Sequence, residues 1–119
     1  YGFLEPYDED WTPNTTDAQG RRYRYGNQPR IALWNLLQLA EAILPLVDDA
    51  RPLEQALQRF HDDYRQRWNG MMAVKLGFEG WTPALQPLID ALPALLQRVE
   101  TDWTLFWRRL ADLDLSQAV

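Results

Sequence analysis

Residues 26–44 read GNQPRIALWNLLQLAEAIL, and they contain the clearest helix start in the chain followed by its longest apolar run. Asn27 can cap this helix, and Pro29 falls near the first helical position, where its missing N–H costs nothing. Pro45 predicts that the helix ends or bends there. The apolar positions cover most of the circumference, which predicts a central, buried helix with Trp34 in the core. These positions are Ile31, Leu33, Trp34, Leu36, Leu37, Leu39, Ala40, Ile43 and Leu44.

A second helix is predicted from Arg51-Pro52 onward, with Asp48 or Asp49 as its cap. Its apolar and aromatic positions recur every three or four residues, which is a helical stripe. Gly inside a helix costs only about 1 kcal/mol relative to Ala, so we expect the helix to pass Gly70 and continue to Lys75. Gly77 is then its C-terminal cap. The stripe consists of Leu53, Leu57, Phe60, Tyr64, Trp68, Met71 and Leu76.

Two further helices follow. Thr82-Pro83 predicts the start of the third, with Thr82 as cap. Pro87 is tolerated if the first turn is irregular, and Pro93 predicts a kink. The fourth is expected to begin after Thr101-Asp102, and the tail 112–119 is expected to fray. Four helices behind an irregular arm predict an all-α domain. The stripe of the third helix consists of Leu85, Leu88, Ile89, Leu92, Leu95, Leu96 and Val99.

Residues 1–28 show no sustained period of either kind, and we interpret them as an irregular arm in front of a helical subdomain at 29–119. A segment of this length without regular structure is uncommon in a compact domain and is often functional. The stretch 21–25, RRYRY, could form part of a short strand pair. As a strand it would place Tyr23 and Tyr25 on one face and Arg22 and Arg24 on the other.

Composition limits the function classes. The chain has 119 residues, which suits one domain, and a net charge of −5, which argues against a nucleic-acid binder. No apolar run approaches the roughly 20 residues of a membrane span. The absence of cysteine excludes disulfides and thiolate metal sites within the chain. The first residue is Tyr and not Met, which suggests an excerpt from a longer protein.

Three groups of residues are candidate sites. His61 is the only histidine and lies off the apolar stripe, so a solvated surface position is favoured over a catalytic one. Asp8, Glu9 and Asp10 could bind a divalent cation, but a solvated acidic turn is the simpler interpretation. The arginines Arg21, Arg22 and Arg24 could clamp a phosphate or contact a substrate, or they could form a local salt-bridged patch.

Several stretches resemble one family, selenoprotein O, also known as YdiU. Residues 1–8, YGFLEPYD, are similar to the segment just downstream of that family's metal-binding Asp. The later landmarks occur in the family's order, with Thr16 in place of the usual Ser, Trp103 in place of Tyr, and Pro93 where a plain helix former is expected. These landmarks are residues 14–17 (NTTD), 20–21 (GR), Tyr23, 27–29 (NQP), 34–36 (WNL), 39–40 (LA), 75–77 (KLG) and 102–108 (DWTLFWR).

The resemblance implies a protein-kinase-like fold and an enzyme that transfers AMP from ATP to Ser, Thr or Tyr hydroxyls of proteins. ATP and Mg or Mn are the cofactors implied for the longer protein. The family's nucleotide-binding, catalytic and metal-binding residues would all lie upstream of Tyr1, so no catalytic, cofactor-binding or metal-binding residue is assigned here. Residues 1–28 would correspond to the activation segment and 29–119 to helices of the C-lobe.

The leading hypothesis is therefore a non-catalytic C-lobe part of an adenylyltransferase pseudokinase, without a cofactor of its own. Its expected partners are the upstream catalytic part of the same protein and that protein's substrates, not nucleic acid or a membrane. Self-association through uncovered aromatic surface, or partial disorder of residues 1–28, is also expected. The location is cytoplasmic if the source is bacterial. The alternative is a standalone helical module that binds a partner protein.

Overall fold

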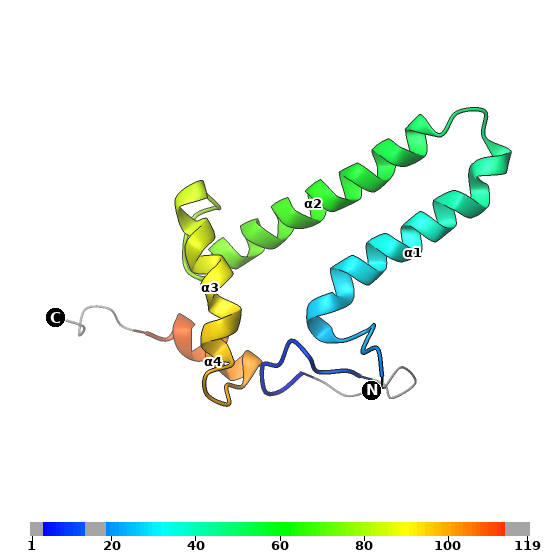
Figure 1. The fold of residues 1–119 in the computed structure, drawn as a ribbon. Coiled ribbons are helices and arrows are strands. Elements are labelled where there is room, and N and C mark those ends of the chain that lie inside the picture. The colour runs from blue at the N-terminus through cyan, green and yellow to red at the C-terminus, as the bar shows by residue number, and fades with distance from the viewer. Residues whose placement is uncertain (1–3, 14–18, 114–119) are drawn as a thin grey trace. The chain divides into compact units, whose positions relative to one another are not determined.

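The computed structural model describes residues 4–13 and 19–113, and over these ranges the chain is all-α, as predicted. Four α-helices follow one another in Figure 1, and the described residues contain no strand, only an isolated antiparallel bridge between Pro6 and Asp102. No described helix combines the length and the apolar character that crossing a membrane requires. The helices are α1 (Gln28–Ile43), α2 (Arg51–Lys75), α3 (Gln86–Leu96) and α4 (Trp103–Ala111).

The chain divides into two compact units, which are described separately. One unit is Glu9–Trp68, and the other combines Tyr1–Asp8 with Asn69–Val119, so the boundary falls inside α2. The expected division into an arm at 1–28 and helices at 29–119 is a functional one and stays a prediction. The landmark residues 14–17 and most of the tail 112–119 lie outside the described residues.

In the unit Glu9–Trp68, α1 begins at Gln28 with Pro29 in its first turn, as predicted. The capping role of Asn27 is wrong. Asn27 already has helical backbone angles because a 3-10 turn at Tyr25–Asn27 precedes the helix, and its Nδ2 donates to the carbonyl oxygen of Arg22 at 2.5 Å. A capping residue normally has an extended backbone that lets its side chain reach forward.

The predicted strand at 21–25 is also wrong. Arg21 has φ of 43°, in the left-handed region, and the Arg24 N–H donates to the Arg21 carbonyl oxygen at 3.1 Å. The chain therefore turns at the point where a strand would continue. Tyr25 N–H and Gly26 N–H close the loop by donating to the carbonyl oxygens of Trp11 (2.8 Å) and Glu9 (2.9 Å). A side chain at Gly26 would place its Cβ 3.1 Å from the Glu9 Cβ, so Glu9 would have to shift slightly to admit a larger residue here.

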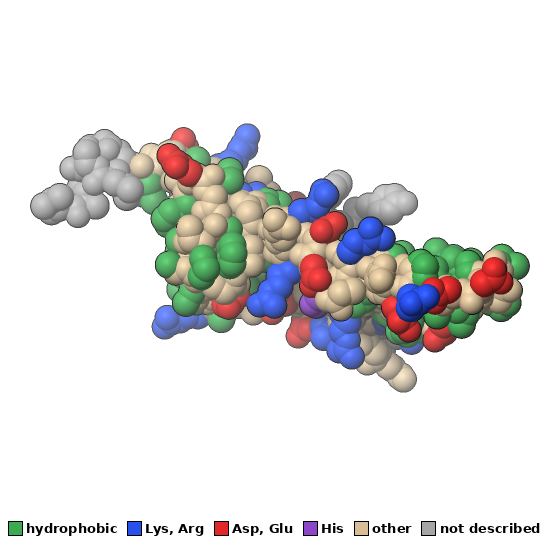
Figure 2. Space-filling model, turned by 90° about the horizontal axis from the view of Figure 1, so that it is seen from above, with side chains coloured by type: hydrophobic (Ala, Val, Ile, Leu, Met, Phe, Trp, Pro, Cys, Tyr) green, Lys and Arg blue, Asp and Glu red, His purple; other side chains and the backbone are tan. Residues whose placement is uncertain are grey.

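The predicted burial of α1 is wrong as well. None of its residues is buried, and Trp34 is 43% exposed. The periodic pattern reports which surfaces of a helix are apolar, and it does not report what covers them. Figure 2 shows hydrophobic side chains at the surface around the end where α1 leads into α2. A 3-10 turn at Leu44–Leu46 follows α1, and Asp49 caps α2 by accepting from the Arg51 N–H at 3.0 Å.

The buried core of the described chain lies in the other unit. Its helix α2 passes Gly70 without a break, as predicted, and buries Asn69, whose Nδ2 donates to the Gln86 Oε1 at 2.7 Å. The N–H groups of Gly77 and Phe78 bond back to the carbonyl oxygens of Val74 and Ala73, and Gly77 has φ of 87°. This is the predicted glycine cap in the form of a Schellman motif. The core consists of Tyr7, Met72, Ala73, Ile89, Leu92 and Leu96.

The last two helices follow local signals in the sequence. A 3-10 turn at Pro83–Leu85 precedes α3, so the Thr82 side chain makes no cap hydrogen bond and that prediction is wrong. The helix continues through Pro93 to Leu96, and the kink there stays a prediction. Asp102 caps α4 because its Oδ1 accepts from the Leu105 N–H at 2.7 Å.

Candidate functional site: two grooves beside the first helix

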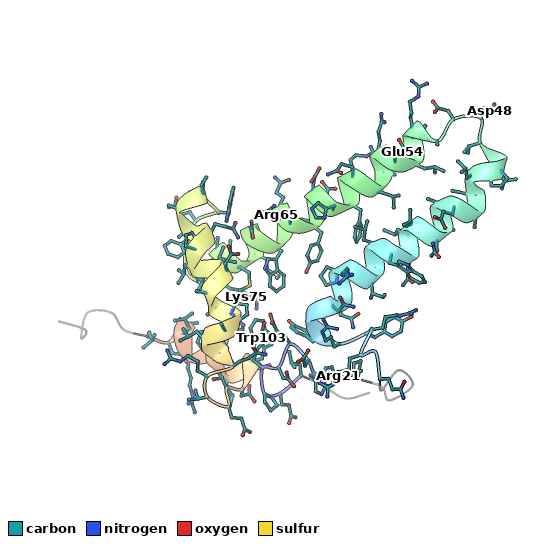
Figure 3. The ribbon with its side chains drawn as sticks, in the orientation of Figure 1. Arg21, Asp48, Glu54, Arg65, Lys75 and Trp103 are labelled. Atoms are coloured by element: carbon teal, nitrogen blue, oxygen red, sulfur yellow. The ribbon has the colours of Figure 1, made fainter. Side chains whose placement is uncertain are left out.

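A basic groove lies beside the start of α1, within the unit Glu9–Trp68, and encloses about 440 Å³. It brings together two of the three predicted arginines, Arg22 and Arg24, and adds Arg30 from the first turns of α1. Arg21, labelled in Figure 3, is exposed and does not line the groove. The lining residues are Gly20, Arg22, Arg24, Asn27, Arg30, Ile31 and Trp34.

Each of the first two arginines makes a local contact. The guanidinium carbon of Arg22 lies 5.2 Å from the centre of the Trp34 ring, which is a cation–π distance. The Nε of Arg24 lies 3.2 Å from the Asp10 Oδ1, and its Nη1 donates to the Arg21 carbonyl oxygen at 3.3 Å. The salt-bridged interpretation therefore describes Arg24, and Arg22 lies over an aromatic ring.

Sequence reasoning missed Arg30 and Trp34 as members of this site. The available signal was their spacing, because residues four apart on a helix share a face. Trp34 was assigned to the core on the assumption that α1 is buried, and its 43% exposure corrects that assignment.

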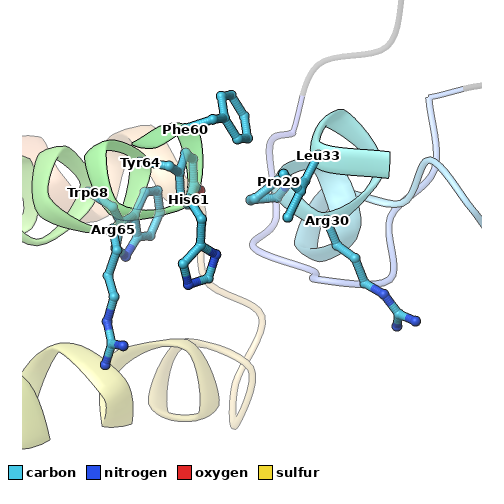
Figure 4. A pocket seen from close by; sticks show the side chains of 8 residues that line it. All are labelled: Pro29, Arg30, Leu33, Phe60, His61, Tyr64, Arg65 and Trp68. Carbon is cyan, nitrogen blue, oxygen red and sulfur yellow. The ribbon is translucent and has the colours of Figure 1, made fainter. Parts of the chain in front are cut away.

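An apolar groove of about 460 Å³ lies between α1 and α2 in the same unit, and Figure 4 shows it from close by. Leu33 and Pro29 extend into it from α1, and the aromatic side chains come from α2. A second hollow, of about 640 Å³, shares Arg30, Leu33 and His61 with it and extends the apolar lining to Leu37 and Leu57. The first groove is lined by Pro29, Arg30, Leu33, Phe60, His61, Tyr64, Arg65 and Trp68.

Two tyrosines of this unit have shifted ionisation. Burial raises the pKa of Tyr25, and the charges of Tyr64 and Glu9 raise it further. Burial also raises the pKa of Tyr64.

His61 is exposed, as predicted, and it lines the apolar groove. Among the described residues, no three His, Cys, Asp or Glu side chains are grouped so that they could hold a metal ion.

The other unit holds an aromatic cluster in which the start of the arm meets α4. The ring of Tyr7 stacks on Trp103 with centroids 4.8 Å apart, and Trp107 meets Trp103 edge-on at 5.3 Å. The Nζ of Lys75 lies 5.0 Å from the Trp107 ring centre; Lys75 and Trp103 are labelled in Figure 3. Backbone bonds from Tyr7 N–H to the Thr101 carbonyl and from Trp103 N–H to the Glu5 carbonyl, both 2.7 Å, fix the same junction.

Comparison with known proteins supports the resemblance. The family model described as Protein adenylyltransferase SelO matches residues 1–119. The chain belongs to the SelO family. This SelO-family chain is 53% identical over 116 residues to the Protein nucleotidyltransferase YdiU of Rhodopirellula baltica, which covers 97% of the chain and 22% of that relative. It is 49% identical over 119 residues to the YdiU protein of Flavobacterium johnsoniae, which covers 100% of the chain and 23% of the relative.

A third YdiU protein, from Xanthomonas oryzae, is 52% identical over 113 residues, 95% of the chain. The SelO-family chain thus spans less than a quarter of the length of these curated relatives.

Proposed function

We propose that this chain is the supporting, non-catalytic helical part of an enzyme that transfers AMP from ATP to Ser, Thr or Tyr hydroxyls of proteins. The observation that carries the proposal is the SelO match over residues 1–119 combined with coverage of only 22–23% of the YdiU relatives. ATP and Mg or Mn would be held by residues that the family resemblance assigns upstream, and no residue of this chain is assigned to them. The bacterial relatives support the expected cytoplasmic location.

The chain's own role is to hold the arm that would correspond to an activation segment. At its start, the arm is anchored by the Tyr7 ring on Trp103 and by the two backbone bonds beside it. At its end, the Gly26 N–H donates to the Glu9 carbonyl oxygen in a close approach that leaves little room for a side chain. In phosphoryl and nucleotidyl transfer most of the catalytic effect comes from positioning and electrostatics, so a fixed arm is what such a scaffold contributes.

The apolar groove between α1 and α2 supports a further element of the proposal, which is that the remainder of the same polypeptide covers it. Apolar grooves of this kind mark interaction surfaces. Since the relatives are more than four times as long as the matched region, the cover is available in the same molecule. The groove equally favours the alternative function, a module that binds a separate partner protein through this surface.

Thiol labelling of the intact protein distinguishes a groove covered by the same polypeptide from a groove that binds a separate partner protein. This chain has no cysteine, so Leu37→Cys, in the second hollow that adjoins the groove, can be compared with Asn35→Cys, exposed on the same helix. Covering by the remainder of the polypeptide predicts that Leu37→Cys reacts at least about tenfold more slowly, which corresponds to about 1.4 kcal/mol of local protection. Equal rates at the two positions would contradict the covered groove and favour the partner-binding module.

Incorporation of labelled AMP from ATP into protein tests the catalytic assignment. The intact protein should transfer AMP, and this chain alone should not. Transfer by the isolated chain would show that the catalytic residues lie within it and would overturn the non-catalytic role.

A further inference from the structure

The basic groove beside the start of α1 concentrates positive charge in a chain whose net charge is −5. Arg22, Arg24 and Arg30 line it, and the described lining residues include no Asp or Glu. Asp10, which pairs with Arg24, lies outside the lining, and its side chain is 64% exposed. Such a concentration of one sign of charge in a concave surface attracts an anion.

The loop that carries Arg22 and Arg24 is held in one backbone conformation. It turns at Arg21 with a φ of 43°, and amide side chains at the start of α1 bind two of its carbonyl oxygens. Asn27 donates to the Arg22 carbonyl, and Gln28 donates to the Tyr23 carbonyl. A loop fixed in this way loses little conformational entropy when it binds a ligand.

Each of the three arginines brings a planar guanidinium to the lining of the groove. Stacking of Arg22 on Trp34 engages the face of the guanidinium, whereas the hydrogen-bond donors lie in its plane. Arg24 uses its Nε for Asp10 and its Nη1 for the Arg21 carbonyl, and the same guanidinium carries further donors. Arg30 adds a third planar set of donors from the rigid helix α1.

We propose that this groove binds a phosphate monoester dianion through Arg22, Arg24 and Arg30. A guanidinium group can bind a phosphate with two parallel hydrogen bonds. Three guanidinium groups suit a phosphate better than a carboxylate, because the phosphate carries more negative charge and more acceptor oxygens. The phosphate could be free or could be carried by a phosphorylated side chain, since the shared chemistry is the monoester. The proposal does not depend on adenylyl transfer by the longer protein.

Protection from phenylglyoxal, which modifies arginine, tests the proposal in the intact protein with mass spectrometry of each arginine. Inorganic phosphate should protect Arg22, Arg24 and Arg30, whereas chloride at the same ionic strength should not. Arg59, exposed on α2, is the internal control and should react at the same rate with either salt. Equal modification of the groove arginines and Arg59 in phosphate would overturn the proposal.

A pair of variants sharpens the test. Arg30→Gln should raise the phosphate concentration needed for half-protection of Arg22 about tenfold, the factor expected for one charge-assisted hydrogen bond. Arg59→Gln removes the same charge outside the groove and should leave that concentration unchanged. An equal effect of both variants would show that only general charge attraction operates, and this would also overturn the site.

The source of the phosphate is found by repeating the protection with phosphothreonine and with AMP. A lower half-protecting concentration for phosphothreonine indicates a phosphorylated side chain, and a lower one for AMP indicates a nucleotide. If the incorporation assay failed while phosphate protection was observed, the proposed function would fall and this inference would stand.

Discussion

Tyr7 anchors the start of the arm, and its replacement by alanine should release that end. Only 7% of Tyr7 is exposed, and its ring stacks on Trp103 at 4.8 Å beside two backbone hydrogen bonds of 2.7 Å. Removing a buried aromatic ring typically costs about 3–5 kcal/mol, of which a stacked pair accounts for about 0.5–1.5 kcal/mol. Tyr7→Ala should therefore favour local opening of this junction by about 3–5 kcal/mol.

Amide hydrogen exchange of the intact protein measures that opening without requiring global two-state unfolding. Because about 1.4 kcal/mol is a factor of ten, the Tyr7→Ala amides at residues 7 and 103 should exchange roughly a hundred to several thousand times faster, up to the rate of an open chain. Amides of residues 25 and 26, bonded to Trp11 and Glu9 in the other unit, should change much less.

The conservative variant Tyr7→Phe keeps the ring and should change the exchange rate at residue 103 by less than about tenfold. The reasoning would be refuted if Tyr7→Ala left the exchange at residues 7 and 103 unchanged. It would also be refuted if Phe and Ala gave the same acceleration, because the packed ring would then not be what anchors the arm.

Three further predictions concern the helix ends and the two tyrosines Tyr25 and Tyr64. Asp102→Ala removes the acceptor of the Leu105 N–H and should destabilise the start of α4 by about 1 kcal/mol, measured as faster exchange at residues 104–106, whereas Asp102→Ser should retain most of the protection. Gly77→Ala should lower the free energy of unfolding by about 1–2 kcal/mol, measured in thermal melts, because φ is 87° with open space around the position. Gly80→Ala, also in open space but outside the left-handed region, should cost little. Burial raises the pKa of Tyr25 and Tyr64 above the usual 10.0, so both tyrosines bind their proton more tightly in the folded state. Their contribution to the free energy of unfolding is fully present below pH 10 and is lost as the pH rises through the folded pKa values. Tyr25→Phe should therefore reduce the loss of stability seen in alkaline melting curves, and an unchanged alkaline slope would contradict this prediction.

The helix boundaries were predictable because their signals are local. Pro29 and Pro45 bracket α1 through the missing N–H and the fixed φ of proline, and Gly77 ends α2 through its positive φ. The turn at Arg21 had no such signal, because a left-handed backbone at an arginine is unusual and leaves no trace in residue type. The role of Asn27 was missed for a related reason, since the preceding 3-10 turn changes where its side chain can reach.

The candidate site was predictable in part. The sequence RRYRY placed Arg22 and Arg24 close together, but membership of Arg30 and Trp34 depends on how the loop folds back onto the first turns of α1. That packing is a tertiary property, and a run of five residues cannot encode it. Arg21 was included because adjacent residues look equivalent in a sequence, whereas the turn directs its backbone carbonyl to Arg24.

The contrast between α1 and α3 shows what an apolar pattern can establish. Both helices are rich in apolar residues, yet Ile89, Leu92 and Leu96 of α3 are buried and no residue of α1 is. The unit of α3 also supplies Met72 and Ala73 to a shared core, and the described residues in the unit of α1 include no buried one. An apolar circumference therefore predicts that a helix packs against further protein surface. The exposed side chains of Leu39 (56%) and Leu46 (83%) show where such a contact is missing. Leaving such surface in water is unfavourable by about 25 cal/mol per Å², so we expect the remainder of the longer protein to change the exposure of α1 far more than that of α3.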